Sequence, residues 1–282
     1  MGKAWMEVGD QVYVRRHESW DLNVGLVIGQ DACLVIDTRA SAREGRELAQ
    51  AVRDVTTAPW IVVNTHAHTD HVLGNQAFRS AAIWSHAHCA QTLACEGHAM
   101  VADLQASVGV DQQTLADLAD TELVVPDQTF HDQVSLTLGD REVVLRFLGR
   151  GHTDGDVIVE VPDAMVVFAG DLVRESGAPW FADSYPVEWP RTLAALRDLA
   201  TGLVVPGHGE AVERAFVDEQ RALLAAVSEI ACSAYADGRP LEDVVPELPL
   251  TPRQATAALT RAYRELAEGT TARVKLSESP GF

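Results

Sequence analysis

The sequence predicts an α/β fold, and two patterns carry this prediction. Short apolar runs rich in Val, Ile and Leu occur in both halves of the chain, bounded by Gly, Asp, Asn or Pro, as expected of strands. Segments with apolar residues at helical spacing lie between these runs, and they dominate from about residue 216 onward. Strands and helices in both halves suit a two-sheet sandwich with helices outside, although periodicity alone indicates only the α/β class.

The first half of the chain combines strands with one clearly marked helix. Strands are predicted over residues 11–14, 24–28 and 32–37, and again over residues 61–64 and 81–84. Ser41 and Glu44 form a capping box, which opens a helix that reaches about residue 55. Residues 88–120 also have a helical pattern.

The second half begins with strands and ends with helices. Strands are predicted over residues 123–125, 134–138, 143–148, 157–161, 165–168 and 203–205, with a helix beginning at Pro190. Beyond residue 216, one helix is ended by Gly238 and Pro240, and another begins at Thr251 and Pro252. We therefore predict a domain over residues 1–215 and a C-terminal helical extension over residues 216–282 that packs on it.

Length and composition are those of a globular protein with a sizeable apolar core. The chain has 282 residues, of which 47% are hydrophobic, enough for one large domain or a domain with an appendage. No window approaches 18 uninterrupted apolar residues, so no transmembrane helix is predicted. The first residues lack the apolar stretch of a secretory signal, so we expect a cytoplasmic protein whose four cysteines are free thiols.

The charge balance excludes one class of partner. The chain carries 22 Lys and Arg residues against 41 Asp and Glu residues, a formal net charge of −19. Such a surface repels phosphate backbones, which bind through clusters of Lys and Arg. We therefore expect a small-molecule substrate and neither a nucleic acid nor a membrane as a partner. No pattern in the sequence indicates an oligomeric state.

A strand that runs into four potential metal ligands is the most specific feature of the chain. The apolar residues 61–63 are followed closely by His66, His68, Asp70 and His71. In an extended segment residues i and i+2 point to the same side, so His66 and His68 can bind one ion together. The alternation then stops, and a turn directs Asp70 and His71 toward a second ion. Imidazole nitrogen and carboxylate oxygen are ligands that suit zinc.

The stretch from Thr65 to His71 resembles the signature of the metallo-β-lactamase superfamily of metal-dependent hydrolases, and the resemblance extends over about residues 7–215. Three later segments, residues 151–156, 168–171 and 206–209, match the family's remaining ligand motifs. The resemblance implies an αβ/βα two-sheet sandwich with metals at one edge between the sheets. It also implies two ligand groups, His66, His68 and His152 for one ion and Asp70, His71 and His208 for the other, with Asp171 bridging them.

The resemblance further implies a hydrolytic mechanism. Two Zn²⁺ ions, with iron or manganese as alternatives, would hold a hydroxide that attacks an activated carbonyl group. Asp70 would orient this hydroxide and is the expected catalytic residue. Asp37 follows a fully apolar strand, where a carboxylate needs a partner, and the family places an Asp there behind the metal ligands.

Asp171 bears on the choice of substrate. β-Lactamases of this family generally carry Cys or Ser at this position, so we expect an activated ester, a lactone or a thioester. Two alternatives stay open. One is a β-lactamase-type hydrolase, and the other is a mononuclear iron persulfide dioxygenase that uses His66, His152 and Asp171.

Aromatic residues and two further histidines remain. Trp20 lies in the polar loop 17–23, which either overhangs the metal site, as in the family, or is a plain hairpin loop. His86 and His88 have ligand-like spacing, but no carboxylate stands beside them, so we expect histidines of a helix start and a loop. Four aromatic residues share one loop after Asp171 and either wall an apolar substrate pocket or pack the loop itself: Trp180, Phe181, Tyr185 and Trp189.

Overall fold

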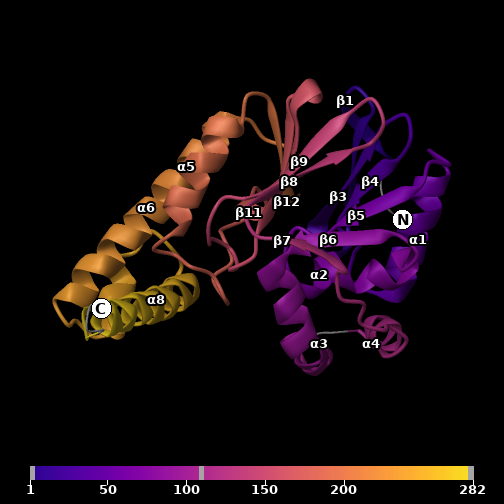
Figure 1. Cartoon of the computed structure of the whole chain (residues 1–282). Coiled ribbons are helices and arrows are strands. Elements are labelled where there is room, and N and C mark those ends of the chain that lie inside the picture. The colour runs from indigo at the N-terminus through magenta and orange to yellow at the C-terminus, as the bar shows by residue number, and fades with distance from the viewer. Residues whose placement is uncertain (1–3, 108–110, 279–282) are drawn as a thin grey trace.

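The computed structural model describes residues 4–107 and 111–278 and contains a mixed β-sheet covered by helices (Figure 1). The described residues form twelve strands, and hydrogen bonds connect them into a sheet of two halves. The expected α/β sandwich is confirmed. No helix among the described residues is long and apolar enough to cross a membrane.

The first half of the sheet is built from the N-terminal strands. Strands β3 and β4 pair antiparallel, and β4 to β7 then run parallel to one another. Strands β1 and β2 add a hairpin on the other side of β3. The strands of this half are β1 (Met6–Gly9), β2 (Val12–His17), β3 (Leu22–Ile28), β4 (Cys33–Ile36), β5 (Trp60–Val63), β6 (Ala82–His86) and β7 (Gln128–Phe130).

The second half follows in the chain. Its strands pair antiparallel, except that β11 and β12 run parallel. The pairing of Leu22 in β3 with His208 in β12 joins the two halves. The strands are β8 (Gln133–Thr137), β9 (Glu142–Phe147), β10 (Val157–Val161), β11 (Val166–Arg174) and β12 (Leu203–His208).

The core of the sandwich lies between the two halves. Alternate residues of a strand point to one face, so Val12 and Val14 of β2 face inward together with Val157 and Val159 of β10. One apolar cluster contains these residues together with Phe168 of β11, and all of them are buried. Burial of each such side chain contributes about 1.5–3 kcal/mol, so this cluster holds the two halves face to face.

Helices cover the outer faces of both halves. Helix α1 begins after Ser41, whose side chain accepts a hydrogen bond from the Glu44 N–H, and it buries Leu48 and Val52 against the first half. Helices α5, α6 and α8 share one apolar core with the outer face of β11, and they extend along that side in Figure 1. The helices are α1 (Ala42–Arg53), α2 (Thr69–Val72), α3 (Ala87–Ala106), α4 (Gln112–Ala119), α5 (Trp189–Leu199), α6 (Arg214–Ala236), α7 (Leu241–Val244) and α8 (Pro252–Glu278). The 3₁₀ turns are Ser19–Asp21, Leu73–Phe78, Pro162–Ala164 and Val245–Glu247.

The structure differs from the sequence prediction in several places. Strands β1 and β7 were not predicted. Residues 123–125 are not a strand, because they cross over the apolar cluster beneath α3, where Leu123 and Val125 pack. The helical segment predicted over residues 88–120 is divided into α3 and α4, and residues 108–110 lie outside the described part of the chain.

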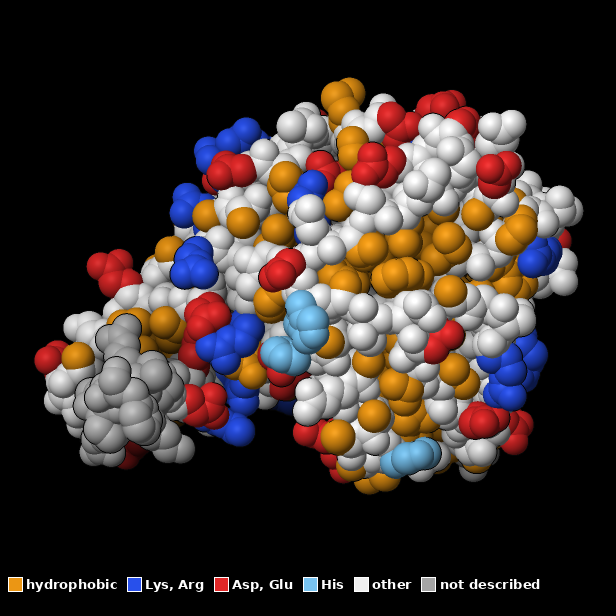
Figure 2. Space-filling model, viewed as in Figure 1, with side chains coloured by type: hydrophobic (Ala, Val, Ile, Leu, Met, Phe, Trp, Pro, Cys, Tyr) orange, Lys and Arg blue, Asp and Glu red, His pale blue; other side chains and the backbone are white. Residues whose placement is uncertain are grey.

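Charged side chains are spread over the molecular surface. On the face seen in Figure 2, acidic and basic side chains stand interspersed, with hydrophobic side chains exposed between them. The site described below lies at the end of the sandwich where the two halves meet.

Candidate metal centre

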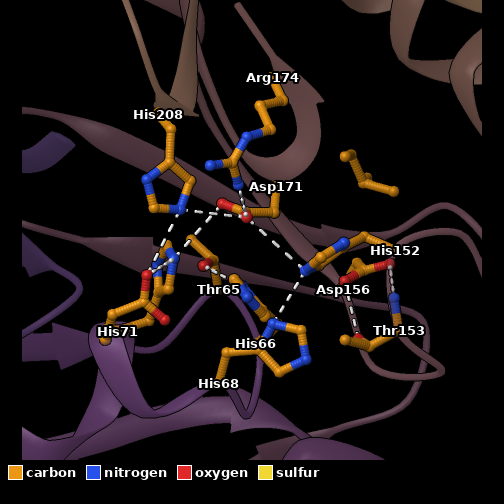
Figure 3. Close-up of polar contacts among 12 residues, drawn as sticks. Thr65, His66, His68, His71, His152, Thr153, Asp156, Asp171, Arg174 and His208 are labelled. Atoms are coloured by element: carbon orange, nitrogen blue, oxygen red, sulfur yellow. Dashed lines mark hydrogen bonds and ion pairs between the residues drawn. The ribbon is translucent and has the colours of Figure 1, made fainter. Parts of the chain in front are cut away.

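Four segments meet at one end of the sandwich, and each follows or belongs to a strand. The turn after β5 supplies His66, His68, Asp70 and His71, and the latter two lie in the short helix α2. The other segments are the loop before β10, strand β11 and the end of β12. They supply His152, Asp171 and His208, which Figure 3 shows converging on the histidines of the first segment.

Two glycines allow these segments to approach one another closely. Gly170 has a φ of +52°, and a Cβ there would lie 2.8 Å from the Cβ of Thr65. A Cβ at Gly207 would lie 1.8 Å from the Oδ1 atom of Asp171. Only glycine leaves room for the Asp171 carboxylate beside β12 and for the close contact of β11 with the β5 turn.

Three groups of side chains bring potential ligand atoms within 4.8 Å of one another. The Nε2 atom of His152 lies 2.9 Å from the Nδ1 atom of His68. Asp171 lies between the groups, with its oxygens 3.3 Å from His71 Nε2, 3.2 Å from His208 Nε2 and 3.6 Å from His152 Nε2. The groups are His66, His68 and His152; His66, His71 and Asp171; and Asp70, His71 and His208.

Several inner atoms of this cluster lack hydrogen-bond partners. Among the described residues, His66 Nε2, His71 Nε2 and Asp171 Oδ1 are buried without a hydrogen bond, although the last two lie 3.3 Å apart, within ion-pair distance. Buried polar atoms are normally hydrogen-bonded, so orphaned atoms that face a common centre call for a missing group. Nitrogen and oxygen donors of this kind fit divalent zinc, which would satisfy all three.

Outer partners fix the tautomers of three histidines. Nδ1 of His71 donates to Asp37 at 2.8 Å, and Nδ1 of His208 donates to the carbonyl of Trp20 at 2.7 Å. The Thr65 hydroxyl donates to Asp37 at 2.9 Å and therefore accepts from Nδ1 of His66 at 3.0 Å. Each Nδ1 proton therefore points to an outer partner and each Nε2 atom faces the centre, where a bound metal would take the place of a proton.

Asp37 thus lies behind the cluster, where the family resemblance put it. Besides His71 it accepts from the Thr65 N–H at 2.8 Å, and it is 2% exposed. It has a left-handed φ of +64°, which turns the chain sharply after β4.

The charges of the cluster depend on its burial. Burial and the neighbouring His71 and His68 hold the pKa of His66 well below its usual value. Burial, with His68 nearby, lowers the pKa of His152 to about 4. Both imidazoles are therefore neutral at pH 7 and able to act as ligands. Burial opposes the charge of Asp171, but His208 and His71 hold the pKa of Asp171 well below its usual range.

The sequence reasoning missed Asp183, which lies behind His68. The Nε2 atom of His68 lies 3.0 Å from both carboxylate oxygens of Asp183, so it donates to that carboxylate and leaves Nδ1 for the centre. Asp183 follows Phe181 and Ala182 in the aromatic loop and belongs to no recognisable motif. A carboxylate three residues beyond a tryptophan in a loop carries no signal that a sequence alone could reveal.

The loop that carries Asp183 also contacts the neighbour of His152 and the C-terminal helix. The Tyr185 N–H donates to the carbonyl of Gly151 at 2.8 Å. Arg261 of α8 donates to the carbonyls of Ser184 at 2.9 Å and Asp183 at 3.0 Å. Helix α8 therefore holds the loop in place from the side opposite the histidines.

A cavity of about 480 Å³ opens onto the cluster. Asp70, His68, His152, Asp171 and His208 reach it, together with residues from several other segments. Arg174 is the cationic side chain among the lining residues, and its Nη1 atom lies 3.6 Å from Asp171 Oδ2. The lining residues outside the cluster are Trp20, Thr69, Met100, Asp103, Arg174, Trp180 and Ala182.

The five aromatic residues proposed to line the substrate site divide into two groups. Trp20 is 44% and Trp180 is 53% exposed, and both line this cavity. Phe181 and Trp189 are 2% and 0% exposed, because they pack in the core between β11 and helices α5 and α6. Tyr185 does not line the cavity and stacks instead with Arg150, whose guanidinium lies 4.2 Å from the ring centre. Phe181, Tyr185 and Trp189 therefore do not line this cavity, although Phe181 lines a neighbouring one.

His86 and His88 lie apart from the cluster. His86 ends β6 and caps α3, where its side chain accepts from the His88 N–H. Its Nε2 atom donates to the carbonyl of His131 at 2.9 Å, and His88 contacts the carbonyl of Asp154. Neither belongs to a group of potential metal ligands among the described residues, in agreement with the expectation for them.

Comparison with known families identifies this architecture. The sequence model of the metallo-β-lactamase superfamily matches residues 20–208, which include all seven residues of the cluster. The chain belongs to the metallo-β-lactamase superfamily. It is accordingly a metal-dependent hydrolase of that superfamily.

Relatives within the superfamily differ in their substrates. The metallo-β-lactamase type 2 of Bacillus cereus is 26% identical over 197 residues, which cover 67% of this chain and 68% of that protein. The acyl-coenzyme A thioesterase MBLAC2 of Homo sapiens is 27% identical over 226 residues, which cover 73% of this chain and 80% of that protein. A solved metallo-β-lactamase from Pontibacter korlensis matches with a TM-score of 0.66 at 20% identity, over 80% of this chain and 99% of that one, and shows the shared fold.

Proposed function

We propose that this protein is a two-metal hydrolase that cleaves acyl thioesters or similarly activated esters and lactones. The observation that carries the proposal is the donor set, in which seven side chains face one centre and leave inner atoms unpartnered. His66, His68 and His152 would hold one ion and Asp70, His71 and His208 the other, with Asp171 between them. Two bound zinc ions would acidify water and polarise a substrate carbonyl, the chemistry that hydrolysis requires.

The second donor group favours two ions over one. Asp70, His71 and His208 form a group as compact as that of His66, His68 and His152. The oxygens of Asp70 lie 3.6 Å from His71 Nε2 and 3.4 Å from His208 Nε2. A persulfide dioxygenase with one iron would leave this second group without a role, which supports hydrolysis instead.

The protein's own residues would position the substrate. The Asp70 side chain is 17% exposed and lines the cavity, where it can orient the attacking water. Arg174 at the cavity wall can bind a negatively charged part of the substrate. Trp20 and Trp180 offer apolar surface on either side of the centre.

The choice of thioesters and esters rests on two supports. Asp171 is a carboxylate where β-lactamases of the family generally have Cys or Ser. The thioesterase MBLAC2 aligns with a larger share of the chain than the β-lactamase of B. cereus does. β-Lactams remain the second candidate, because β-lactamases also align with this chain.

A side-by-side assay tests the proposal. Zinc-loaded protein should bind close to two ions per chain by elemental analysis. It should hydrolyse thioesters, lactones or aryl esters with a higher kcat/KM than any penicillin, cephalosporin or phosphodiester. Binding of at most one ion, or fastest turnover of a β-lactam, would contradict the proposal.

A further inference from the structure

A second cavity borders the metal cavity on the side of the C-terminal helices. It has a volume of about 330 Å³, at the lower end of the range for cavities that hold small-molecule ligands. The two cavities share Trp180 and Ala182, so they adjoin at this short stretch of loop. The second cavity is lined by Pro179, Trp180, Phe181, Ala182, Thr251, Arg253, Gln254 and Ala257.

The loop side of this cavity is apolar. Pro179 and Trp180 form that wall together with Ala182, and Trp180 is 53% exposed despite its large apolar ring. On the other side, α8 contributes the exposed Arg253 and the half-buried Gln254 and Ala257, and the small side chain of Ala257 leaves the space beside the loop open. The ring of Trp180 therefore offers apolar surface to a ligand at the point where the two cavities adjoin.

Both walls of the cavity are fixed in position. Arg261 of α8 binds two carbonyls of the loop, as described above, and Glu265 accepts from the N–H groups of Val187 at 2.9 Å and Glu188 at 3.0 Å. Glu265 is 8% exposed, so these bonds are sheltered from water. The cavity is therefore preformed by the loop and α8 and need not open at a cost in binding free energy.

We propose that this second cavity is the subsite for the substrate's acyl group, and that it takes an uncharged, unbranched alkyl chain. This inference rests on the proposed hydrolysis of thioesters and esters. With the carbonyl at the metal centre, the chain would pass Trp180 and Ala182 and lie between the loop and Ala257. In the reaction, the oxygen of water bonds to the acyl carbon and the bond from that carbon to sulfur breaks. Of the two protons of that water, one goes to the departing thiolate and the other to solvent, and the fatty acid leaves as the carboxylate.

The first experiment measures how hydrolysis depends on chain length. The substrates are the acetyl, butanoyl, hexanoyl and octanoyl thioesters of one thiol, N-acetylcysteamine, and the protein is the zinc-loaded full chain. Burial of a methylene group raises kcat/KM by roughly fourfold when the group leaves water completely. We expect kcat/KM to rise at least about tenfold from acetyl to hexanoyl, because several methylene groups enter the cavity.

Variants locate the effect in this cavity. Ala257→Trp fills the space on the α8 side, and Ala257→Leu fills part of it. The ratio of hexanoyl to acetyl kcat/KM should fall toward one in the first variant and to an intermediate value in the second. Thr260→Trp is the matched control, because Thr260 is exposed on the same helix and does not line the cavity. It should keep the ratio of the unmodified protein.

Each outcome supports or overturns the inference. Because the ratio compares two substrates on the same sample, partial unfolding of a variant lowers both rates and leaves the ratio unchanged. Equal kcat/KM values along the series overturn the acyl subsite while leaving the proposed hydrolysis intact. Unchanged ratios in both Ala257 variants overturn it as well. Absence of hydrolysis of every thioester, including acetyl, would instead overturn the proposed function and the subsite with it.

Discussion

Asp171 lies at the middle of the cluster and contacts histidines from both halves of the sheet. Replacement of a residue that merely supports a metal ligand typically lowers metal affinity or activity by about 10- to 100-fold. Asp171→Ala removes a central donor and should therefore lower hydrolysis by about two orders of magnitude or more. Elemental analysis of the variant should also find fewer ions per chain.

His88→Ala is the control for that change. It removes an imidazole from a ligand-like pair, but this imidazole contacts Asp154 and the ring of His86 and no residue of the cluster among the described contacts. Metal content and hydrolysis should stay close to those of the unmodified protein. Equal losses in Asp171→Ala and His88→Ala would mean that the cluster has been assigned wrongly.

The residues of the cluster could be predicted from sequence because each belongs to a short motif next to an apolar strand. His66 and His68 follow β5, and His208 ends β12. Asp183 and Arg174 could not be predicted in this way. Asp183 reaches His68 from 115 positions away in the chain, and only the folded loop brings them together.

Glu265 provides a test of stability against pH. Burial raises the pKa of Glu265 from 4.5 to about 7. The native state therefore retains a proton that the unfolded chain releases above about pH 4.5, and this contribution to stability is lost as pH rises through about 7. Relative to Glu265→Gln, the free energy of unfolding of the unmodified protein should fall between pH 5 and 7.5 by up to about 3 kcal/mol.

Urea denaturation of both proteins at the two pH values measures this difference. Other titrating groups cancel, because they are present in both proteins. Glu268→Gln is the matched control one turn further along α8, where the residue is exposed and pairs with Arg264. It should show the same pH dependence as the unmodified protein. If the free energy of unfolding changed equally with pH in Glu265→Gln and in the unmodified protein, the raised pKa of Glu265 would be contradicted.

Among the elements, α8 and the loop over residues 178–188 act on the metal centre together. Arg261 holds the loop backbone at Asp183, and Asp183 holds the imidazole of His68. If the site holds the two zinc ions proposed above, Asp183→Asn should weaken binding of one of them by about 10- to 100-fold. Arg261→Ala should weaken the same ion by about tenfold or less, because the loop keeps its bonds to Glu265.

Competition with a zinc chelator measures the affinity of each ion directly. Arg264→Ala removes the same charge from α8, but Arg264 pairs with Glu268 and does not contact the loop in the described hydrogen bonds. It should leave both affinities unchanged, and Arg261→Lys should recover part of the loss. If the Arg261→Ala and Arg264→Ala proteins bound the ions with equal affinities, the proposed link between α8 and the metal centre would be refuted.

Elements with regular patterns were predictable, and irregular ones were not. The Ser41 cap and the apolar strands β4, β5 and β11 each have a local signal that the structure retains. The apolar residues 123–125 resemble a strand, but they pack beneath α3 without strand pairing. Tertiary packing decides the secondary structure of such short apolar segments, and a short window of sequence carries no information about that packing.

At the scale of the whole molecule, we propose that the helical extension over residues 216–282 is required for folding of the domain over residues 1–215. Val217 and Leu224 of α6 and Leu259 of α8 are fully buried in one cluster with Leu193 and Val204. A chain that ends at residue 215 would expose this apolar surface. Each lost burial costs about 1.5–3 kcal/mol, and several together exceed a typical total stability of about 5–15 kcal/mol.

Circular dichroism during heating tests this dependence. The chain over residues 1–215 should show no cooperative transition, whereas the full chain should unfold in a single one. A shortened chain that melts cooperatively near the temperature of the full chain would show that the two parts fold independently.

The seven clustered side chains come from both sides of the Leu22–His208 pairing, four from the first half of the sheet and three from the second. Ions bound among them would cross-link the two halves of the sheet at the end of the sandwich that carries the site. Free metal would then stabilise the native state by mass action, and a chelator would act as a mild denaturant. Amide hydrogens near the ends of β3 and β12 would exchange faster with deuterium after the metal ions were removed. The free energy of unfolding of such a protein would therefore depend on the concentration of free metal around it.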